Sequence, residues 1–154
     1  KKEHDLPVLD SSRERQKLLD IADKSPEAVK EYAVSLGIAF QIKDDILDYV
    51  GDEALGKPTG IDLKEHKITL PLLCCFDDAA KEAEIRKMIS DIHNHPEYCE
   101  QIRTFVLENR GVEKAGDILE GYIRKSLDAL DVFPDGKEKE FLTRIAKYNT
   151  IRNS

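Results

Sequence analysis

The residues best suited to chemistry are three aspartates on one predicted helix, Asp44, Asp45 and Asp48. Helical neighbours lie three or four residues apart, and no lysine or arginine stands at those offsets from the three acids. Asp44 and Asp48 form a like-charge pair that costs a helix roughly 0.2–0.5 kcal/mol. The nearby C-terminal end of the helix also disfavours negative charge. The simplest missing partner is Mg²⁺, which binds through a few carboxylates, waters and substrate phosphate oxygens.

The helix that holds these acids is predicted to begin at Ser25-Pro26-Glu27 and to end at Gly51, because serine caps helices and proline suits their first position. Its apolar residues recur every three or four positions and predict a core-facing stripe: Val29, Ala33, Leu36, Ala39, Ile42, Ile46 and Val50. A second line has the same spacing: Gly37, Gln41, Asp44 and Asp48. We therefore expect the acids to share a face with a glutamine and a glycine.

The segment after this helix supplies charges of both signs. Residues 51–62 are predicted to form a loop, because glycines and a proline interrupt any helical pattern there. The loop contains Lys57 and ends at Asp62, and Lys67 is expected to begin the next helix, with Pro71 in its first turn. Binding a metal diphosphate requires this combination, since the metal needs carboxylates and the remaining phosphate oxygens need cations.

The rest of the chain predicts an all-α fold. Amphipathic helices are expected over residues 12–23, 79–93, 96–109, 111–131 and 137–152, and no stretch shows the alternation typical of a strand. The length of 154 residues suits a single domain over residues 1–154, with a loose N-terminal segment at residues 1–10.

Composition excludes several classes of function. A net charge of −7 argues against nonspecific nucleic-acid binding. No apolar run approaches the length of a membrane span, which is about 20 residues. Three cysteines are an odd number and suit reduced thiols better than a disulfide framework, so we expect a cytoplasmic protein.

Three consecutive motifs resemble the second aspartate-rich region of the trans-prenyl (polyprenyl) diphosphate synthases. They are Phe40-Gln41-x-x-Asp44-Asp45-x-x-Asp48, Gly56-Lys57-x-x-Gly60-x-Asp62-Leu63 and Lys67-x-Thr69-Leu70-Pro71. The resemblance covers about residues 26–150 and implies a helical bundle of the isoprenoid synthase type. The family's first aspartate-rich motif and the arginine pair that follows it are missing here, so the chain resembles an incomplete half of that fold.

The resemblance implies a prenyltransferase of isoprenoid biosynthesis. An allylic prenyl diphosphate ionises with the help of Mg²⁺, and isopentenyl diphosphate attacks the resulting carbocation. By the resemblance, the metal-binding residues would be Asp44, Asp45, Asp48 and, in the outer shell, Asp62. Lys57 and Lys67 would contact the allylic diphosphate and stabilise the leaving group, as the catalytic residues. Gln41 would lie near that diphosphate, and Phe40 near isopentenyl diphosphate.

Each of these residues also has an ordinary structural interpretation. The acids could form a solvated face, Phe40 could pack in the core, and Asp62 could cap a helix. Lys57 could be an ordinary loop lysine, and Lys67 could serve solubility.

Two other classes of metal-binding protein do not fit the sequence. An EF-hand is excluded, because a loop starting at Asp48 lacks the required oxygen ligand and glycine. The second metal motif of class I terpene cyclases mixes asparagine, serine or threonine and glutamate, and this sequence lacks that form. A non-catalytic partner subunit of a prenyl diphosphate synthase remains the alternative function.

The missing motif leaves three origins open: a truncated chain, a proteolytic fragment, or one chain of a split enzyme. We expect the chain alone to be inactive or weakly active. We also expect it to form a homo-oligomer or to pair with a chain that carries the missing N-terminal half.

Overall fold

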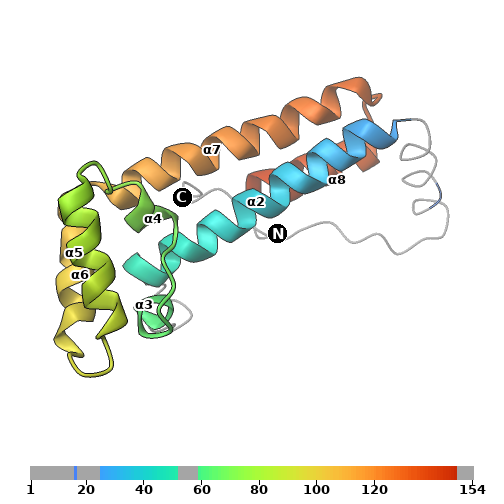
Figure 1. Cartoon of the computed structure of the whole chain (residues 1–154). Coiled ribbons are helices and arrows are strands. Elements are labelled where there is room, and N and C mark those ends of the chain that lie inside the picture. Colours follow the sequence, from blue (N-terminus) through green and yellow to red (C-terminus); the bar gives the residue numbers. More distant parts are fainter. Residues whose placement is uncertain (1–15, 17–24, 52–58, 149–154) are drawn as a thin grey trace. The chain divides into compact units, whose positions relative to one another are not determined.

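The structure is a computed structural model, and it describes residues 16, 25–51 and 59–148. Its elements are α2 (Pro26–Val50), α3 (Ile61–Lys64), α4 (Leu70–Leu73), α5 (Ala79–Ser90), α6 (Glu97–Glu108), α7 (Gly111–Ala129), the 3₁₀ helix η1 (Leu130–Val132) and α8 (Lys137–Tyr148) (Figure 1). The described residues contain no strand, and the all-α prediction is confirmed. The helix predicted over residues 12–23 lies outside the described residues except for Gln16, which is helical.

The chain divides into two compact units, and both α2 and α7 contribute residues to each of them. The first unit comprises residues 1–40 and 119–154, and the second comprises residues 41–118. In the first unit, buried Tyr32, Leu130, Phe133 and Ala146 form a core. The Tyr32 hydroxyl donates a hydrogen bond of 2.7 Å to the carbonyl of Leu142, which joins α2 to α8. The single domain expected over residues 1–154 stays a prediction.

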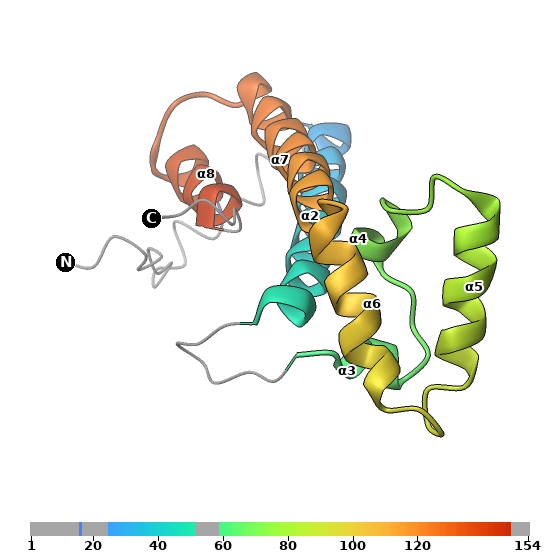
Figure 2. The same ribbon diagram turned by 90° about the vertical axis from the view of Figure 1, so that its left-hand side faces the viewer.

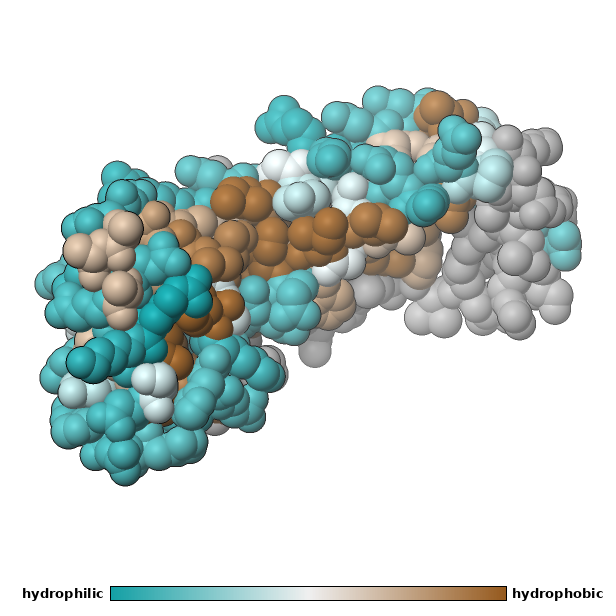
Figure 3. All heavy atoms as spheres, in the orientation of Figure 1, coloured by the Kyte–Doolittle hydropathy of each residue, from teal (hydrophilic) through white to brown (hydrophobic). Residues whose placement is uncertain are grey.

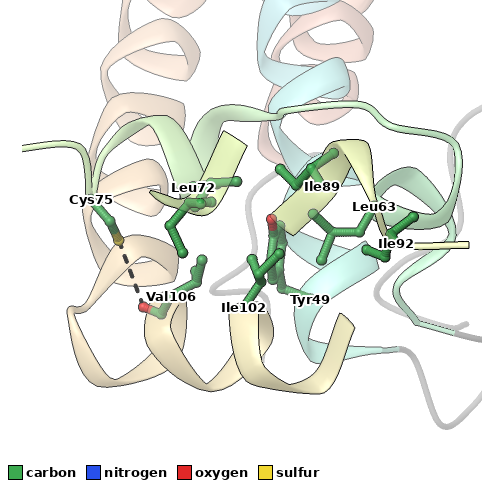
Figure 4. Close-up of a cluster of buried hydrophobic side chains, with 9 residues drawn as sticks. Tyr49, Leu63, Leu72, Cys75, Ile89, Ile92, Ile102 and Val106 are labelled. Atoms are coloured by element: carbon green, nitrogen blue, oxygen red, sulfur yellow. Dashed lines mark hydrogen bonds between the residues drawn. The ribbon is translucent and has the colours of Figure 1, made fainter. Parts of the chain in front are cut away.

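The second unit has its own core beneath the acidic end of α2. Every helix of this unit contributes to it or packs against it, and its buried members are Tyr49, Leu63, Leu72, Cys75, Ile85, Ile89, Ile92, Ile102 and Val106 (Figure 4). Helices α5 and α6 run side by side there (Figure 2). The Cys75 thiol lies 3.9 Å from the carbonyl oxygen of Val106 (Figure 4). A Cβ atom at Gly111 would lie 2.7 Å from the Cys75 sulfur and would collide with the carbonyl oxygen of Pro71, so α7 must begin with glycine.

Helix α2 begins and ends where the sequence predicts. Its first helical residue is Pro26, and the amide of Val29 donates to the carbonyl of Ser25 at 3.1 Å. Its end at Gly51 depends on a backbone φ of +80°, a left-handed conformation that glycine adopts readily. The Gly51 amide donates to the carbonyl of Leu47 at 2.7 Å, which closes the last turn.

The buried face of α2 differs in part from the predicted stripe. Its buried residues are Tyr32, Ser35, Ala39, Ile42, Ile46 and Tyr49. Ala33 and Val50 are exposed, so the prediction is wrong at these two positions, whereas Val29 and Leu36 are half-buried and pack against the core of the first unit. The two tyrosines decide the phase of the helix, because their large side chains fill the two cores. Apolar side chains also remain exposed along α2 (Figure 3), where Val34 and Ile38 are 49% and 38% exposed.

Two further predictions are corrected at the start of the next helices. Asp62 lies inside α3, whereas the sequence predicted a loop there. Lys67 does not begin a helix, because residues 67–69 are irregular and α4 starts at Leu70. Pro71 does stand in the first turn of α4, as predicted. In the part of the chain that the structure describes, no helix has the length and apolar character that a membrane span requires.

Candidate functional site

Asp48 connects the end of α2 to the start of α3. Its Oδ1 accepts the amide of Ile61 at 3.1 Å, and its Oδ2 accepts the amide of Asp62 at 3.3 Å. Its main-chain carbonyl accepts the amide of Gly60 at 2.9 Å. Asp48 lies in the last turn of α2 and Ile61 is the first residue of α3, so the carboxylate satisfies amides that have no partner within α3. Asp48 is thereby held in one orientation at the C-terminal end of α2.

Asp45 lies beside Asp48, and its environment is unfavourable for a charge. Its Oδ1 accepts a hydrogen bond of 3.0 Å from the side-chain amide of Gln41, one turn earlier. Burial raises the pKa of the Asp45 carboxyl, and the charges of Asp44 and Asp48 add to this shift. The hydrogen bonds from Gln41 and from the backbone of Leu70 oppose the shift without cancelling it. The surroundings of Asp45 in the folded chain therefore disfavour the charged form of its carboxyl group.

Asp44, Asp45 and Asp48 form an acidic group with a fourth carboxylate, that of Asp62, which comes from α3. Burial is the main cause that raises the pKa of the Asp62 carboxyl, and the negative charges of Asp48 and Asp45 raise it further. The positive charge of Lys67 lowers this pKa by less. Burial also raises the pKa of the Tyr49 phenol, with smaller contributions from Asp48 and Asp62. The carboxylates of Asp45, Asp48 and Asp62 thus lie close enough to repel one another, above a buried tyrosine.

Lys67 stands at the edge of this acidic group. Its backbone amide donates to the carbonyl of Asp62 at 2.8 Å, which places the residue directly after α3. Its ammonium group pairs with Glu65 at 3.0 Å, and the two side chains are 60% and 54% exposed. The hydrogen bond and charge of Glu65 raise the pKa of Lys67, with a smaller contribution from Asp62. An exposed pair of this kind contributes little to stability, so the ammonium group can exchange Glu65 for another anion.

The remaining predicted residues have few contacts. Asp44 is exposed, and its carboxylate makes no hydrogen bond or ion pair with any described residue. Phe40 is 54% exposed and belongs to the first unit, so core packing does not explain this residue. Lys57 lies outside the described residues, and the structure gives no position for its side chain.

The donor set of the site suits a hard divalent cation. All four acids offer only oxygen ligands, which Mg²⁺ and Ca²⁺ prefer. Among residues 25–51 and 59–148, no three acidic, histidine or cysteine side chains converge on a common metal position. Mg²⁺ does not require such a cage, because it commonly binds through one or two carboxylates together with waters and substrate phosphates. The assignment of Asp44, Asp45, Asp48 and Asp62 as metal-binding residues stays a prediction.

Comparison with known proteins identifies the family. Residues 12–106 match the sequence model of the polyprenyl synthetase family. The chain belongs to this family. Its sequence is 33% identical over 130 residues to an octaprenyl diphosphate synthase from Haemophilus influenzae, covering 82% of this chain and 39% of that relative. It is 31% identical over 127 residues to the heptaprenyl diphosphate synthase component 2 of Bacillus subtilis, covering 82% and 36%.

Solved structures of polyprenyl synthases agree with the fold. A polyprenyl synthase from Caulobacter crescentus, complexed with calcium and isoprenyl diphosphate, matches with a TM-score of 0.71 and 33% identity. The match covers 83% of this chain and 40% of that one. The chain thus spans about two fifths of the length of the polyprenyl synthases it resembles, and the incomplete helical bundle inferred from the motifs is confirmed.

One residue near the site was not foreseen from the sequence. Arg103 of α6 donates from Nε to the carbonyl oxygen of Tyr49 at 2.7 Å, and Tyr49 directly follows Asp48 in the chain. These two residues are 54 positions apart, and no motif of the polyprenyl synthase resemblance includes Arg103. Only the tertiary fold brings α6 to the end of α2, so no local pattern could have indicated this contact.

Proposed function

We propose that this chain provides the second acidic motif and the diphosphate-binding lysines of a trans-prenyl diphosphate synthase. The substrates would be an allylic prenyl diphosphate and isopentenyl diphosphate, joined by chain elongation. The observation that supports the proposal most is the group of mutually repelling carboxylates beside Lys67, at the end of a helix with no basic residue in its last turn. Such a group is stabilised when a cation and an anion bind together.

The roles of the residues are those that the family resemblance implies. Asp44, with no hydrogen bond or ion pair to any described residue, would be a direct metal ligand, and Asp45 and Asp48 would orient it or hold its waters. Asp62 would contribute from the outer shell. Lys67 would leave Glu65 to bind the diphosphate, together with Lys57. Gln41 would lie near the diphosphate, and Phe40 would contact isopentenyl diphosphate. Mg²⁺, when bound, would neutralise the charge that develops on the departing diphosphate.

Completing the active site would require the segment that relatives carry in the rest of their length. We therefore expect little or no turnover from this chain alone, and elongation once a polypeptide with the first acidic motif is supplied. The alternative is a non-catalytic partner subunit. Two relatives, a component 2 in Bacillus subtilis and a subunit 1 in Schizosaccharomyces pombe, bear names that indicate pairing of subunits. A cytoplasmic location stays a prediction, since other relatives are named mitochondrial or chloroplastic.

Calorimetric titration of the chain with Mg²⁺ and pyrophosphate tests the proposal. The expected result is saturable binding that Asp44→Ala weakens about tenfold or more, because a ligand to the ion is lost. Asp117→Ala is the matched control, since Asp117 is also an exposed helical aspartate with no hydrogen bond or ion pair to a described residue. It removes the same charge from α7 and should bind like the original chain. Absence of binding, or an equal loss in both variants, would contradict the proposal.

A further inference from the structure

The end of α2 concentrates negative charge from two sources. The carbonyl groups of the last turn give a helix C-terminus a partial charge of about −0.5, and no basic residue of α2 lies in that turn. Asp44, Asp45 and Asp48 add their carboxylates to the same end. A cation from another element would therefore stabilise this helix end before any ligand binds.

Arg103 supplies that cation from α6. Its Nε donates to the carbonyl oxygen of Tyr49 at 2.7 Å, and its Nη1 pairs with Glu100 at 3.1 Å. The Arg103 side chain is 31% exposed, whereas the Glu100 side chain is 73% exposed. The contact with the Tyr49 carbonyl is thus the more protected of the two. Without it the carbonyl, which belongs to a residue only 2% exposed, would lose a charge-assisted hydrogen bond.

The three consecutive carbonyls before the end of α2 have three different partners. Leu47 accepts from the amide of Gly51, Asp48 accepts from the amide of Gly60, and Tyr49 accepts from Arg103. The carboxylate of Asp48 depends on this arrangement, because its hydrogen bonds to Ile61 and Asp62 require the last turn to stay in register with α3. Arg103 is the only member of the set that lies far away in sequence, on a helix packed in the same core.

We propose that Arg103 is a positioning residue for the acidic motif. It fixes the last turn of α2 so that Asp48 remains on the amides of Ile61 and Asp62. It acts through the main chain of Tyr49 and makes no contact with metal or diphosphate. The consequence for ligand binding rests on the proposed function, whereas the consequence for the geometry of Asp48 does not.

The test compares Arg103→Met and Arg103→Lys with two controls. Glu100→Gln removes the ion pair but keeps the bond from Arg103 to Tyr49. Arg86→Met makes the same chemical change in α5, where Arg86 pairs with Glu82 at 2.9 Å. The first measurement is amide hydrogen exchange at Ile61 and Asp62. The second is the affinity for Mn²⁺ without any other ligand, measured from the paramagnetic broadening of NMR lines.

Arg103→Met should speed exchange at Ile61 and Asp62 by about tenfold relative to Ile85 and Ile89 in α5, because the bonds to Asp48 open more often. It should also weaken Mn²⁺ binding several-fold, with partial rescue by Arg103→Lys. Glu100→Gln and Arg86→Met should match the original chain in both measurements. Should Arg103→Met fail to fold, Arg103→Lys shows a smaller change of the same direction in both measurements.

The direction in which Arg103→Met changes the affinity for Mn²⁺ distinguishes a positioning role of Arg103 from simple repulsion between its charge and the cation. Removing a nearby positive charge should tighten cation binding, so tighter binding by Arg103→Met would overturn the inference. Unchanged exchange at Ile61 and Asp62 would overturn it as well. If the original chain binds no Mn²⁺ while exchange still rises in Arg103→Met, the positioning of Asp48 is supported and the proposed function fails.

Discussion

Helix α5 and the C-terminal half of α2 both contain acidic residues, but these acids are paired with basic residues in α5 and not at the end of α2. In α5, Glu82 pairs with Arg86 at 2.9 Å and Glu84 pairs with Lys81 at 3.0 Å. At the end of α2, burial and mutual repulsion raise the pKa of Asp45, and the last turn of the helix contains no basic residue. The first arrangement is that of an ordinary solvated helix. The second stores repulsion that a bound cation would relieve.

Substitution of the helix-capping aspartates, one in each region, is expected to have the largest effect on stability. Asp48 accepts two amides at the start of α3, and Asp78 accepts the amide of Ala80 at 3.0 Å at the start of α5. Asp48→Ala and Asp78→Ala should each cost about 1 kcal/mol of unfolding free energy. The midpoint of thermal unfolding should fall by about 2–4 °C in both. Calorimetric scans measure this loss.

Only Asp48→Ala should also weaken binding of Mg²⁺ with pyrophosphate, since Asp78 lies at the start of α5, outside the acidic group of Asp44, Asp45, Asp48 and Asp62. Asp78→Ala is therefore the control for destabilisation without loss of the site. Equal affinity of the two variants for Mg²⁺ with pyrophosphate would contradict a role of Asp48 in ligand binding and leave it only as a helix cap.

A smaller effect of opposite sign is expected at Asp45. Its pKa is raised above the ordinary value of 3.8, so the native state holds the proton more tightly than the unfolded chain. Ionisation therefore removes stability as the pH rises from 3.8 through the raised pKa, and at neutral pH the charged Asp45 destabilises the fold. Asp45→Asn keeps an oxygen for Gln41 and should stabilise the chain by about 0.2–0.5 kcal/mol at pH 7.

The matched change in α5 should have the reverse result. Glu82→Gln breaks the pair with Arg86 and should cost about 0.3–0.5 kcal/mol, an effect that salt reduces. Urea titrations at pH 4 and pH 7 compare the two variants, and the gain from Asp45→Asn should shrink at the lower pH. A lower unfolding free energy for Asp45→Asn at pH 7 would show that the charge of Asp45 is already compensated.

Local patterns predicted α2 well, because its limits depend on nearby residues. Pro26 at the first position and Gly51 with its positive φ mark the ends without help from the rest of the fold. The acidic line was also predictable, since the spacing of Asp44 and Asp48 fixes them on one helix face. The same holds for the family resemblance, which depends on short motifs.

The parts that the sequence did not predict depend on distant partners. The buried face of α2 includes Tyr32, whose hydroxyl donates a hydrogen bond to the carbonyl of Leu142, 110 residues away, and the spacing of the aliphatic residues did not indicate this tyrosine. Asp62 was assigned to a loop because the four-residue helix α3 is too short to show a period. Arg103 was missed because its partner lies on another helix.

The central claim is that Asp44, Asp45 and Asp48 of α2 bind a metal diphosphate together with Lys57 and Lys67. Residue-resolved NMR of the isotope-labelled chain, titrated with Mg²⁺ and pyrophosphate, tests it most directly. The account predicts shifts that saturate at residues 44–48 and 60–67 and leave the amides of α5 unchanged. Shifts centred on α5, or none at the acidic end of α2 at millimolar ligand, would contradict it.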